Sequence, residues 1–498
     1  MLGLFPIFII MRRIFRNIHV LAVFFSLMAL SCTKDSAPMQ FGDYPTEIGQ
    51  IMNYKCATSG CHNSISAAGS AGLDLSSYSS LFNGSTSGSP VIPYRSDFSS
   101  LCYFINTYNE YGPQNQPTMP LNGTALSREE VKTIKDWIDR GAPDINGKVM
   151  WSDDDRRKKY YVLNQGCDVV TVFEAKTQLP IRYITVGNRP NIAESPHMIR
   201  VSHDGKYWYV IFVANNILQK FRASDDVLVG EVDLGRAPGN LGYDNWNTMA
   251  ISDDNKRAYI TSWQTNSRIA AVDLDNMRLL HNFGGLTDAH GTALNATNDT
   301  IYVTKQSGNY IYKIDTGFSS INTVVLDVAG TAPVASPSMD PHEVAFSPDG
   351  SRYFVSCQGS DEVRVMQTAG DVFLVAVHTG KYPVEMIVNA PRNKLYVTCM
   401  EDPNTNPKIK GSVSMIDMSS YSVANFKVGY EPHGIAIDEV NKLLIVSNRN
   451  ILVSGPTPHH TGVCGRNGFI NYFNLNTMQL LTRKTEVAAD PYSVAVRP

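Results

Sequence analysis

A short sequence pattern recurs through residues 146–498, and this repetition limits the folds open to the chain more than any other feature. Seven copies begin near residues 196, 247, 289, 341, 383, 432 and 491, at spacings of 42 to 59 residues. The openings Pro196-His197 and Pro432-His433 are typical members of the set. Repeats of this length are typical of four-stranded propeller blades, which stack side by side around an axis.

Turn and strand signals follow each opening. The turns at residues 202–205 and 347–350 contain Asp-Gly pairs, which favour hairpins. Short strands rich in β-branched and aromatic residues come next, for example at residues 301–304 and 395–398. Each copy therefore reads as an inner strand, a tight turn and further strands of one blade.

The two ends of the repeat region complement each other. The last copy leaves room for one strand before Pro498, whereas residues 159–185 read as a blade that lacks its first strand. We expect the terminal strand to complete that blade, because ring closure removes free sheet edges. The sequence thus predicts a mainly β fold with a seven-bladed propeller over residues 151–498. The repeats resemble the YVTN-type propeller repeats of exported bacterial proteins, a likeness that implies a fold rather than a function.

The N-terminal residues have the pattern of an export signal. Arg12 and Arg13 precede an apolar run over residues 20–30, which suits a signal peptide. Residues 27–32 resemble the lipobox of bacterial lipoproteins, so residues 1–32 would be the signal, Cys32 the lipidated residue and residues 33–44 a tether. A plain secretory signal is the alternative. The resemblance implies export and lipid anchoring at a bacterial membrane, on the periplasmic side or the outer surface, in an oxidising compartment.

Residues 45–145 contain a cysteine pair followed directly by a histidine. Four residues separate Cys56 from Cys61, and His62 comes next. The usual c-type haem motif has two residues between its cysteines. Such a motif works because two thioethers fix the porphyrin edge while the adjacent imidazole reaches the iron. A Cys56–Cys61 disulfide beside a surface histidine is the alternative interpretation.

Two further features accompany the cysteine pair. Met119 lies in an extended Pro-Thr-Met-Pro segment, where its thioether could be a second axial ligand, or it could be a core residue. Ser127 and Glu130 have capping-box spacing and predict the start of a helix that ends near Gly141.

The order of these features resembles the small cytochrome c domains of exported bacterial proteins, over about 100 residues. The likeness implies a small α-helical domain at residues 45–145 with one haem c, attached through Cys56 and Cys61. His62 would be the proximal ligand and Met119 the distal ligand. The four-residue loop between the cysteines is longer than in the usual motif. Covalent attachment of the haem is therefore the part of the likeness that this sequence matches least well.

Histidines recur at one position of the propeller repeat. Because the first strand of each blade lines the central channel, residues that open these strands should meet at one mouth of the channel. The histidines at this position are His197, His290, His342 and His433. Neutral imidazoles in such a ring could bind copper or iron. Alternatively, they only pack and form hydrogen bonds there.

The remaining cysteines allow several interpretations. His459, His460 and Cys464 lie close together in an insertion and could bind a metal ion, or Cys464 could form a disulfide with Cys167. The other pair, Cys357 and Cys399, ends equivalent strands of neighbouring blades. These two residues could form a disulfide or remain buried thiols.

Composition narrows the function. A formal net charge of −3 gives no positive field for nucleic acid, and we find no serine triad, phosphate-binding glycine loop or nucleotide fingerprint. We therefore expect a haem-binding electron-transfer lipoprotein whose propeller docks a redox partner protein or holds a second redox or metal site. A periplasmic oxidoreductase acting on a small-molecule substrate is one variant. The alternative is a ligand- or protein-binding propeller with a structural or sensory haem.

Overall fold

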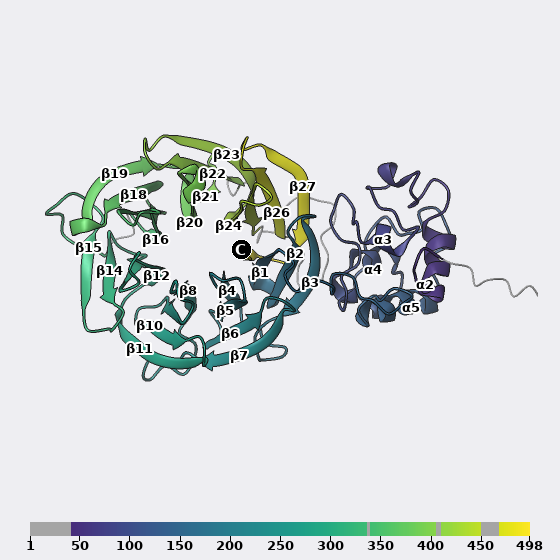
Figure 1. Cartoon of the computed structure of the whole chain (residues 1–498), viewed down its shortest axis with the longest axis horizontal. Coiled ribbons are helices and arrows are strands. Elements are labelled where there is room, and N and C mark those ends of the chain that lie inside the picture. Colours follow the sequence, from purple (N-terminus) through teal and green to yellow (C-terminus); the bar gives the residue numbers. More distant parts are fainter. Residues whose placement is uncertain (1–40, 336–338, 405–409, 450–467) are drawn as a thin grey trace, which may run out of the picture.

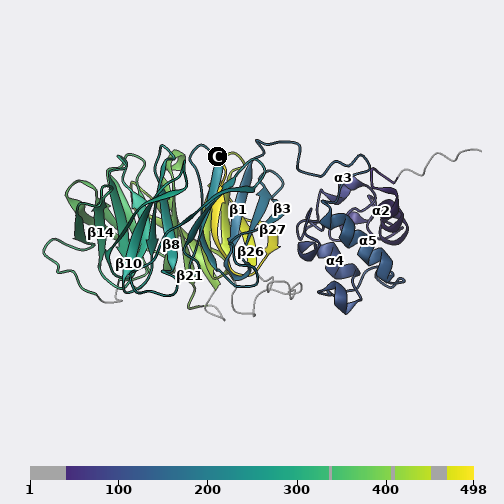
Figure 2. The same cartoon turned by 90° about the horizontal axis from the view of Figure 1, so that it is seen from below.

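A computed structural model describes residues 41–335, 339–404, 410–449 and 468–498. It shows a ring of β-sheets with a small helical unit against one edge (Figures 1 and 2). The expected signal peptide with Cys32, most of the tether, and the group His459, His460 and Cys464 lie outside the described residues. None of the described helices combines the length and apolar character needed to cross a membrane.

The helical unit contains four short α-helices around its own core. Helix α2 runs directly into a π-helical turn that ends at Cys56. The helices are α2 (Thr46–Ile51), α3 (Tyr78–Leu81), α4 (Ser100–Ile105) and α5 (Arg128–Asp139). Tyr44, Met52 and Trp137 are completely or almost completely buried in this core. The unit therefore has a hydrophobic centre separate from those of the blades.

Helix α5 confirms the helix predicted from the capping-box spacing. The Glu130 amide donates to Ser127 Oγ at 3.2 Å, and the Ser127 amide donates to Glu130 Oε2 at 2.7 Å. The apolar stripe of the helix, which includes Val131 and Ile134, is buried. Glu130 Oε2 also pairs with Lys55 Nζ at 2.7 Å, which fixes the start of α5 beside the cysteine loop.

The propeller has seven four-stranded antiparallel sheets, as the repeats predict. The innermost strands are β4 (Pro196–Val201), β8 (Trp246–Ile251), β12 (Ala289–Leu294), β16 (Pro341–Phe346), β20 (Lys381–Asn389), β24 (Pro432–Asp438) and β28 (Pro491–Val496). The second strands are β5 (Tyr207–Phe212), β9 (Arg257–Ser262), β13 (Thr300–Lys305), β17 (Arg352–Cys357), β21 (Lys394–Glu401), β25 (Leu443–Asn448) and β1 (Lys159–Asn164).

The outer half of each blade completes the ring. The third strands are β6 (Ile217–Arg222), β10 (Ser267–Asp273), β14 (Tyr310–Asp315), β18 (Glu362–Gln367), β22 (Lys410–Asp417), β26 (Gly468–Asn474) and β2 (Val169–Glu174). The fourth strands are β7 (Val227–Asp233), β11 (Arg278–Leu286), β15 (Ile321–Val325), β19 (Val372–His378), β23 (Val423–Tyr430), β27 (Leu480–Val487) and β3 (Leu179–Thr185). Strands β1 and β2 are buried along their whole length, whereas β7 is largely exposed.

One blade joins the two ends of the propeller, as predicted. Its strand order is β28-β1-β2-β3, and Tyr160 and Val162 of β1 pair with Val496 and Val494 of β28. The ring therefore has no open seam between its first and last strands.

The expected Asp-Gly turns connect first and second strands. In the turn between β4 and β5, Ser202 Oγ donates to Asp204 Oδ1 at 2.7 Å, and Gly205 has a φ of +68°. The turn between β16 and β17 repeats this arrangement, with a bond of 2.6 Å from Ser347 Oγ to Asp349 Oδ1. Glycine suits the positive φ because it has no Cβ.

The helical unit packs directly on the closing blade. Phe98 stacks on Tyr183 of β3 with ring centroids 4.2 Å apart. Ser89 Oγ donates to the Pro180 carbonyl at 2.7 Å, and Arg95 donates to the Tyr183 carbonyl at 3.2 Å. Phe98 and Tyr183 belong to one buried cluster, so the two parts share a hydrophobic contact.

Candidate functional site

One cavity brings together four residues that the sequence predicts to act together. Cys56, Cys61, His62 and Met119 all line this space, which has a volume of about 490 Å³. The volume lies within the range of ordinary cofactor pockets. Two segments more than fifty residues apart in the sequence thus meet at the same cavity.

Backbone hydrogen bonds fold the long cysteine loop back on itself. The Cys61 amide donates to the Thr58 carbonyl at 3.0 Å, and the His62 amide donates to the Cys56 carbonyl at 3.1 Å. Ser70 Oγ donates to the Cys61 carbonyl at 3.1 Å. The four intervening residues therefore still allow both cysteines and the histidine to face one space.

The side chains of Cys56, Cys61 and His62 could bind a further group. Cys56 and Cys61 are both thiols in the structure, and burial raises the pKa of Cys56 to about 12. His62 Nδ1 is buried and has no hydrogen-bond partner among the described residues. Buried polar atoms normally have a partner, so this imidazole fits a site completed by a bound group.

The Met119 segment is held against helix α4. The Met119 amide donates to the Phe104 carbonyl at 2.8 Å, and the Asn115 amide donates to the Tyr103 carbonyl at 2.9 Å. The Met119 side chain is half-buried, packs against the core of the helical unit and lines the cavity. It is therefore placed for either of its two predicted roles.

The propeller supplies another wall of the cavity, which the sequence patterns do not indicate. Pro180 and Tyr183 of β3, Phe469 of β26, and Lys484 and Glu486 of β27 line it. The Lys484 ammonium lies 4.0 Å from the centre of the Phe469 ring. Burial lowers the pKa of Lys484. The cavity thus lies between the two parts of the chain.

The four predicted histidines are all buried at the openings of first strands. Three of them link neighbouring blades through the carbonyl at the equivalent position of the next blade. Nδ1 of His197 donates to the Asn247 carbonyl at 2.8 Å. The corresponding bonds run from His290 to the His342 carbonyl at 3.2 Å and from His433 to the Tyr492 carbonyl at 3.1 Å.

These bonds determine which ring nitrogen carries the proton. A carbonyl oxygen only accepts, so Nδ1 of these imidazoles is the protonated nitrogen and Nε2 retains a free electron pair. Burial lowers the pKa of His197 to about 3 and that of His290 to about 4, so both rings are neutral near pH 7. The predicted packing role is therefore present in the structure, and it leaves Nε2 available as a ligand.

The distances between the rings of the four histidines differ. His290 and His342 have ring centroids 4.1 Å apart, whereas the His342–His433 and His197–His290 separations are 5.8 and 6.2 Å. One ligand atom each from His290, His342 and Glu343 lie within 4.8 Å of one another. Glu343 was not a predicted ligand, although its place next to His342 at the opening of a first strand was a usable signal.

Cys357 and Cys399, which the sequence predicts to be either a disulfide or two buried thiols, are thiols in the structure. Cys357 and Cys399 are both buried and not joined to each other. Burial raises the pKa of Cys399 to about 11, so it is a neutral thiol at ordinary pH. Of the two alternatives for this pair, the structure has the buried thiols.

Comparison with known proteins shows the fold alone. The sequence matches no protein-family model and no curated protein. A functionally unknown protein from Desulfotomaculum acetoxidans has 15% identity and a TM-score of 0.51, covering 68% of this chain and 98% of that one. A Bacteroides uniformis protein with a provisional 6-phosphogluconolactonase assignment has 13% identity and a TM-score of 0.51, covering 68% and 100%. Kuenenia stuttgartiensis hydrazine synthase has 17% identity and a TM-score of 0.48, covering 63% and 94%.

Proposed function

We propose that this chain is an exported, lipid-anchored electron-transfer protein that carries one covalent haem c in its helical unit. Cys56 and Cys61 would hold the haem through thioether bonds, and His62 and Met119 would bind its iron. The observation that carries the proposal is that these four residues line one cavity, although Met119 lies 57 positions beyond His62 in the sequence. A haem held there would supply reversible one-electron transfer.

The chain's own residues suit this role. Apolar side chains such as Leu75, Ile92 and Leu101 line the cavity and would exclude water from a flat apolar ring. The Lys55–Glu130 ion pair and the capped start of α5 hold the cysteine loop against the helical core. A rigid surround favours electron transfer because it limits rearrangement between oxidation states.

The propeller would serve as the docking platform for a redox partner protein or a small-molecule substrate. Its outer strands β3, β26 and β27 contribute one wall of the cavity, so a molecule seated on the propeller is near the proposed cofactor. Export fits the proposal because the lipobox resemblance implies export, and haem attachment to Cys56 and Cys61 would take place outside the cytoplasm.

The decisive test is covalent haem staining. The full chain is expressed in bacteria with and without a cytochrome maturation system, and denaturing gels are stained for haem. We expect staining of the wild-type chain with the maturation system. Cys61→Ala should lose most of the stain, and Cys56→Ala/Cys61→Ala should lose all of it. Cys102→Ala is the matched control, because Cys102 is buried in the same unit but does not line the cavity.

Two results would overturn the haem proposal. One is a colourless wild-type protein in which mass spectrometry finds Cys56 joined to Cys61. The other is equal haem staining in the wild-type and double-alanine proteins. A haem that is bound but shows no reversible reduction would instead favour the structural or sensory alternative.

The lipid anchor is tested separately. Cells are grown with labelled fatty acid, and the label is followed in wild-type and Cys32→Ala protein. We expect label and membrane association in the wild type only. An exported wild-type protein without label would leave a plain secretory signal as the correct interpretation.

A further inference from the structure

We infer that the propeller axis contains a buried site for one divalent transition-metal ion, formed by His290, His342 and Glu343. His290 opens strand β12, and His342 with Glu343 opens the neighbouring strand β16. The site uses none of the residues proposed to hold haem, so the two proposals stand or fall separately.

The three side chains have the proximity that a shared ion requires. Their ligand atoms lie within 4.8 Å of one another, and all three residues are buried. Two nitrogens bound to one zinc ion lie at most about 4.2 Å apart, twice the usual bond length. The 4.8 Å within which the three ligand atoms lie is close to this limit.

Two buried atoms of the site lack an ordinary hydrogen bond among the described residues, although Glu343 Oε1 lies 4.0 Å from His290 Nδ1 and the Val384 backbone is near the His342 ring. His342 Nδ1 and Glu343 Oε1 are both buried, and neither has a hydrogen bond of ordinary geometry within the described part of the chain. His342 is 2% exposed and Glu343 is 5% exposed. An unmade hydrogen bond at a buried acceptor or donor costs about 1–3 kcal/mol, and coordination of an ion would remove that cost.

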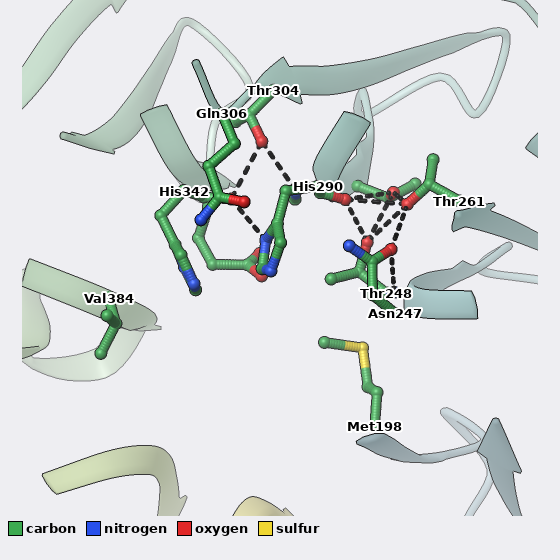
Figure 3. Close-up of polar contacts among 12 residues, drawn as sticks. Met198, Asn247, Thr248, Thr261, His290, Thr304, Gln306, His342 and Val384 are labelled. Atoms are coloured by element: carbon green, nitrogen blue, oxygen red, sulfur yellow. Dashed lines mark hydrogen bonds and ion pairs between the residues drawn. The ribbon is translucent and has the colours of Figure 1, made fainter. Parts of the chain in front are cut away.

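A hydrogen bond fixes the orientation of the His290 ring. The His342 carbonyl accepts from His290 Nδ1 at 3.2 Å and from Thr304 Oγ1 at 3.0 Å, and Thr304 Oγ1 accepts from the Gly291 amide at 2.7 Å. Figure 3 shows these bonds and the His290 and His342 rings beside each other. Hydrogen bonds of this kind hold metal-binding imidazoles in one tautomer and orientation.

Local charge also favours a cation. Glu343 and Glu385 are both buried. Neither carboxyl forms an ion pair with a lysine or arginine in the described ranges. Arg200 acts on both only from a longer distance. A buried carboxylate without a paired charge is unfavourable, and a divalent ion would supply the missing positive charge.

The donor set indicates the class of ion. Two imidazole nitrogens and one carboxylate oxygen suit Zn²⁺, Fe²⁺ or Cu²⁺, whereas Mg²⁺ and Ca²⁺ prefer oxygen ligands. With three protein ligands, such a site would retain an open coordination position. Zn²⁺ is the practical probe because it does not change oxidation state.

The test measures metal binding to the full chain. Protein stripped with chelator is dialysed against Zn²⁺, and bound zinc is counted by elemental analysis. We expect one zinc ion per wild-type chain and a rise in thermal stability with added Zn²⁺. His290→Gln, His342→Gln and Glu343→Gln should each weaken binding by more than the roughly 10–100-fold cost of losing an outer-shell partner.

Three control proteins separate this site from others. His203→Ala removes an exposed propeller histidine and should leave binding unchanged. His459→Ala/His460→Ala removes the other candidate metal ligands and should also leave the axial ion in place. Cys61→Ala, which lacks the proposed haem attachment, should bind zinc as the wild type does.

The outcomes are distinct. A wild-type chain that binds no zinc overturns the inference whatever the variants do. Stoichiometric zinc that survives all three glutamine changes, or disappears in His459→Ala/His460→Ala, also overturns it. Circular dichroism of each variant shows whether loss of binding accompanies loss of the fold. If one variant unfolds, the test relies on the other two, whose thermal stability is measured with and without Zn²⁺.

Discussion

Met119 and Met150 are both half-buried against the core of the helical unit, but only Met119 lines the cavity. If Met119 is the distal ligand, Met119→Leu should lower the reduction potential of the haem, because His/Met ligation raises it. The shift should be a sizeable part of the roughly 0.8 V range that axial ligands span. Potentiometric titration of purified protein measures it.

Met150→Leu is the matched control for this change. It removes a thioether from the same core without touching the cavity, and the backbone bond from the Met150 amide to the Tyr78 hydroxyl remains. We expect an unchanged potential. Equal potentials in the wild type and both variants would show that Met119 is a core residue only.

Glu439 predicts a pH dependence of stability. It pairs with Arg392 at 2.7 Å and accepts from Asn389 at 2.7 Å, which joins two neighbouring blades. The hydrogen bonds from Arg392 lower the pKa of Glu439 from 4.5 to about 2. Since the pKa falls on folding, the stabilisation is complete above pH 4.5 and is lost as pH falls toward 2.

Glu439→Gln should therefore reduce the free energy of unfolding at pH 7 by about 1 kcal/mol, a value limited by solvent screening near the surface. The difference from wild type should shrink below pH 4.5. Urea unfolding at pH 7 and pH 3 measures both values. Asp155→Asn removes an exposed carboxylate and should change little at either pH; a constant difference for Glu439→Gln would refute the assignment.

Single residues also show what sequence reasoning can reach. The buried positions of His197, His290, His342 and His433 followed from their place in the repeat, because equivalent positions of a propeller face the same axis. Glu343 shares that place, but its lack of a hydrogen-bond partner depends on neighbours in another blade. A periodic sequence pattern does not indicate that a buried carboxylate lacks a hydrogen-bond partner.

Among the strands, the approach of β12 to β16 depends on a missing side chain. A Cβ on Gly291 would lie 2.7 Å from the Glu343 Cα, too close for any real contact. Gly434 has the same relation to β28, with 2.9 Å to the Ser493 Cα. The Pro-His-Gly and similar openings thus allow the innermost strands to come together, which places His290 against His342.

Gly291→Ala should separate β12 from β16. We expect a loss of about 1–3 kcal/mol in unfolding free energy, the usual cost of overpacking, together with weaker zinc binding. Urea unfolding and zinc dialysis measure the two effects. Gly242→Ala is the control, since its nearest neighbour would be an ordinary 3.5 Å away. Normal stability in Gly291→Ala would contradict the close-approach argument.

Elements defined by local chemistry were predictable from the sequence. The cap of α5 uses Ser127 and Glu130, three residues apart, and the turn after β4 uses Ser202, Asp204 and Gly205. These contacts form within one turn of chain, so their residue types carry the information. The π-helical turn that ends at Cys56 had no comparable local signal.

For the molecule as a whole, β28 is the most consequential strand. It pairs with β1 and lies against both β4 and β24. Removal of residues 491–498 should open the ring and expose an unpaired edge. We expect a loss of about 5 kcal/mol or more, because several buried side chains lose their contacts.

Unfolding and light scattering of the truncated chain measure this effect. A synthetic peptide of residues 489–498 should restore part of the stability when added in trans. The same peptide with Val494→Asp should not, because Val494 is 5% exposed in the closed blade. A truncated chain as stable as the wild type would show that closure contributes little.

The packing of the helical unit on the propeller could not be predicted from the sequence. Ring closure could be predicted because the repeat leaves one strand missing at the start and one extra at the end. The stacking of Phe98 on Tyr183 brings together residues 85 positions apart that share no motif. Such a contact depends on complementary shapes, which neither periodicity nor composition records.

The propeller wall of the cavity bears on the order of assembly. This wall includes Phe469, Lys484 and Glu486, which come more than 400 residues after Cys56 in the sequence. Strand β27 belongs to the blade next to the closing blade. The pocket thus lacks one wall until the propeller has folded. Any group joined to Cys56 and Cys61 early would be reachable by a maturation enzyme, and propeller closure would then act as the final cover.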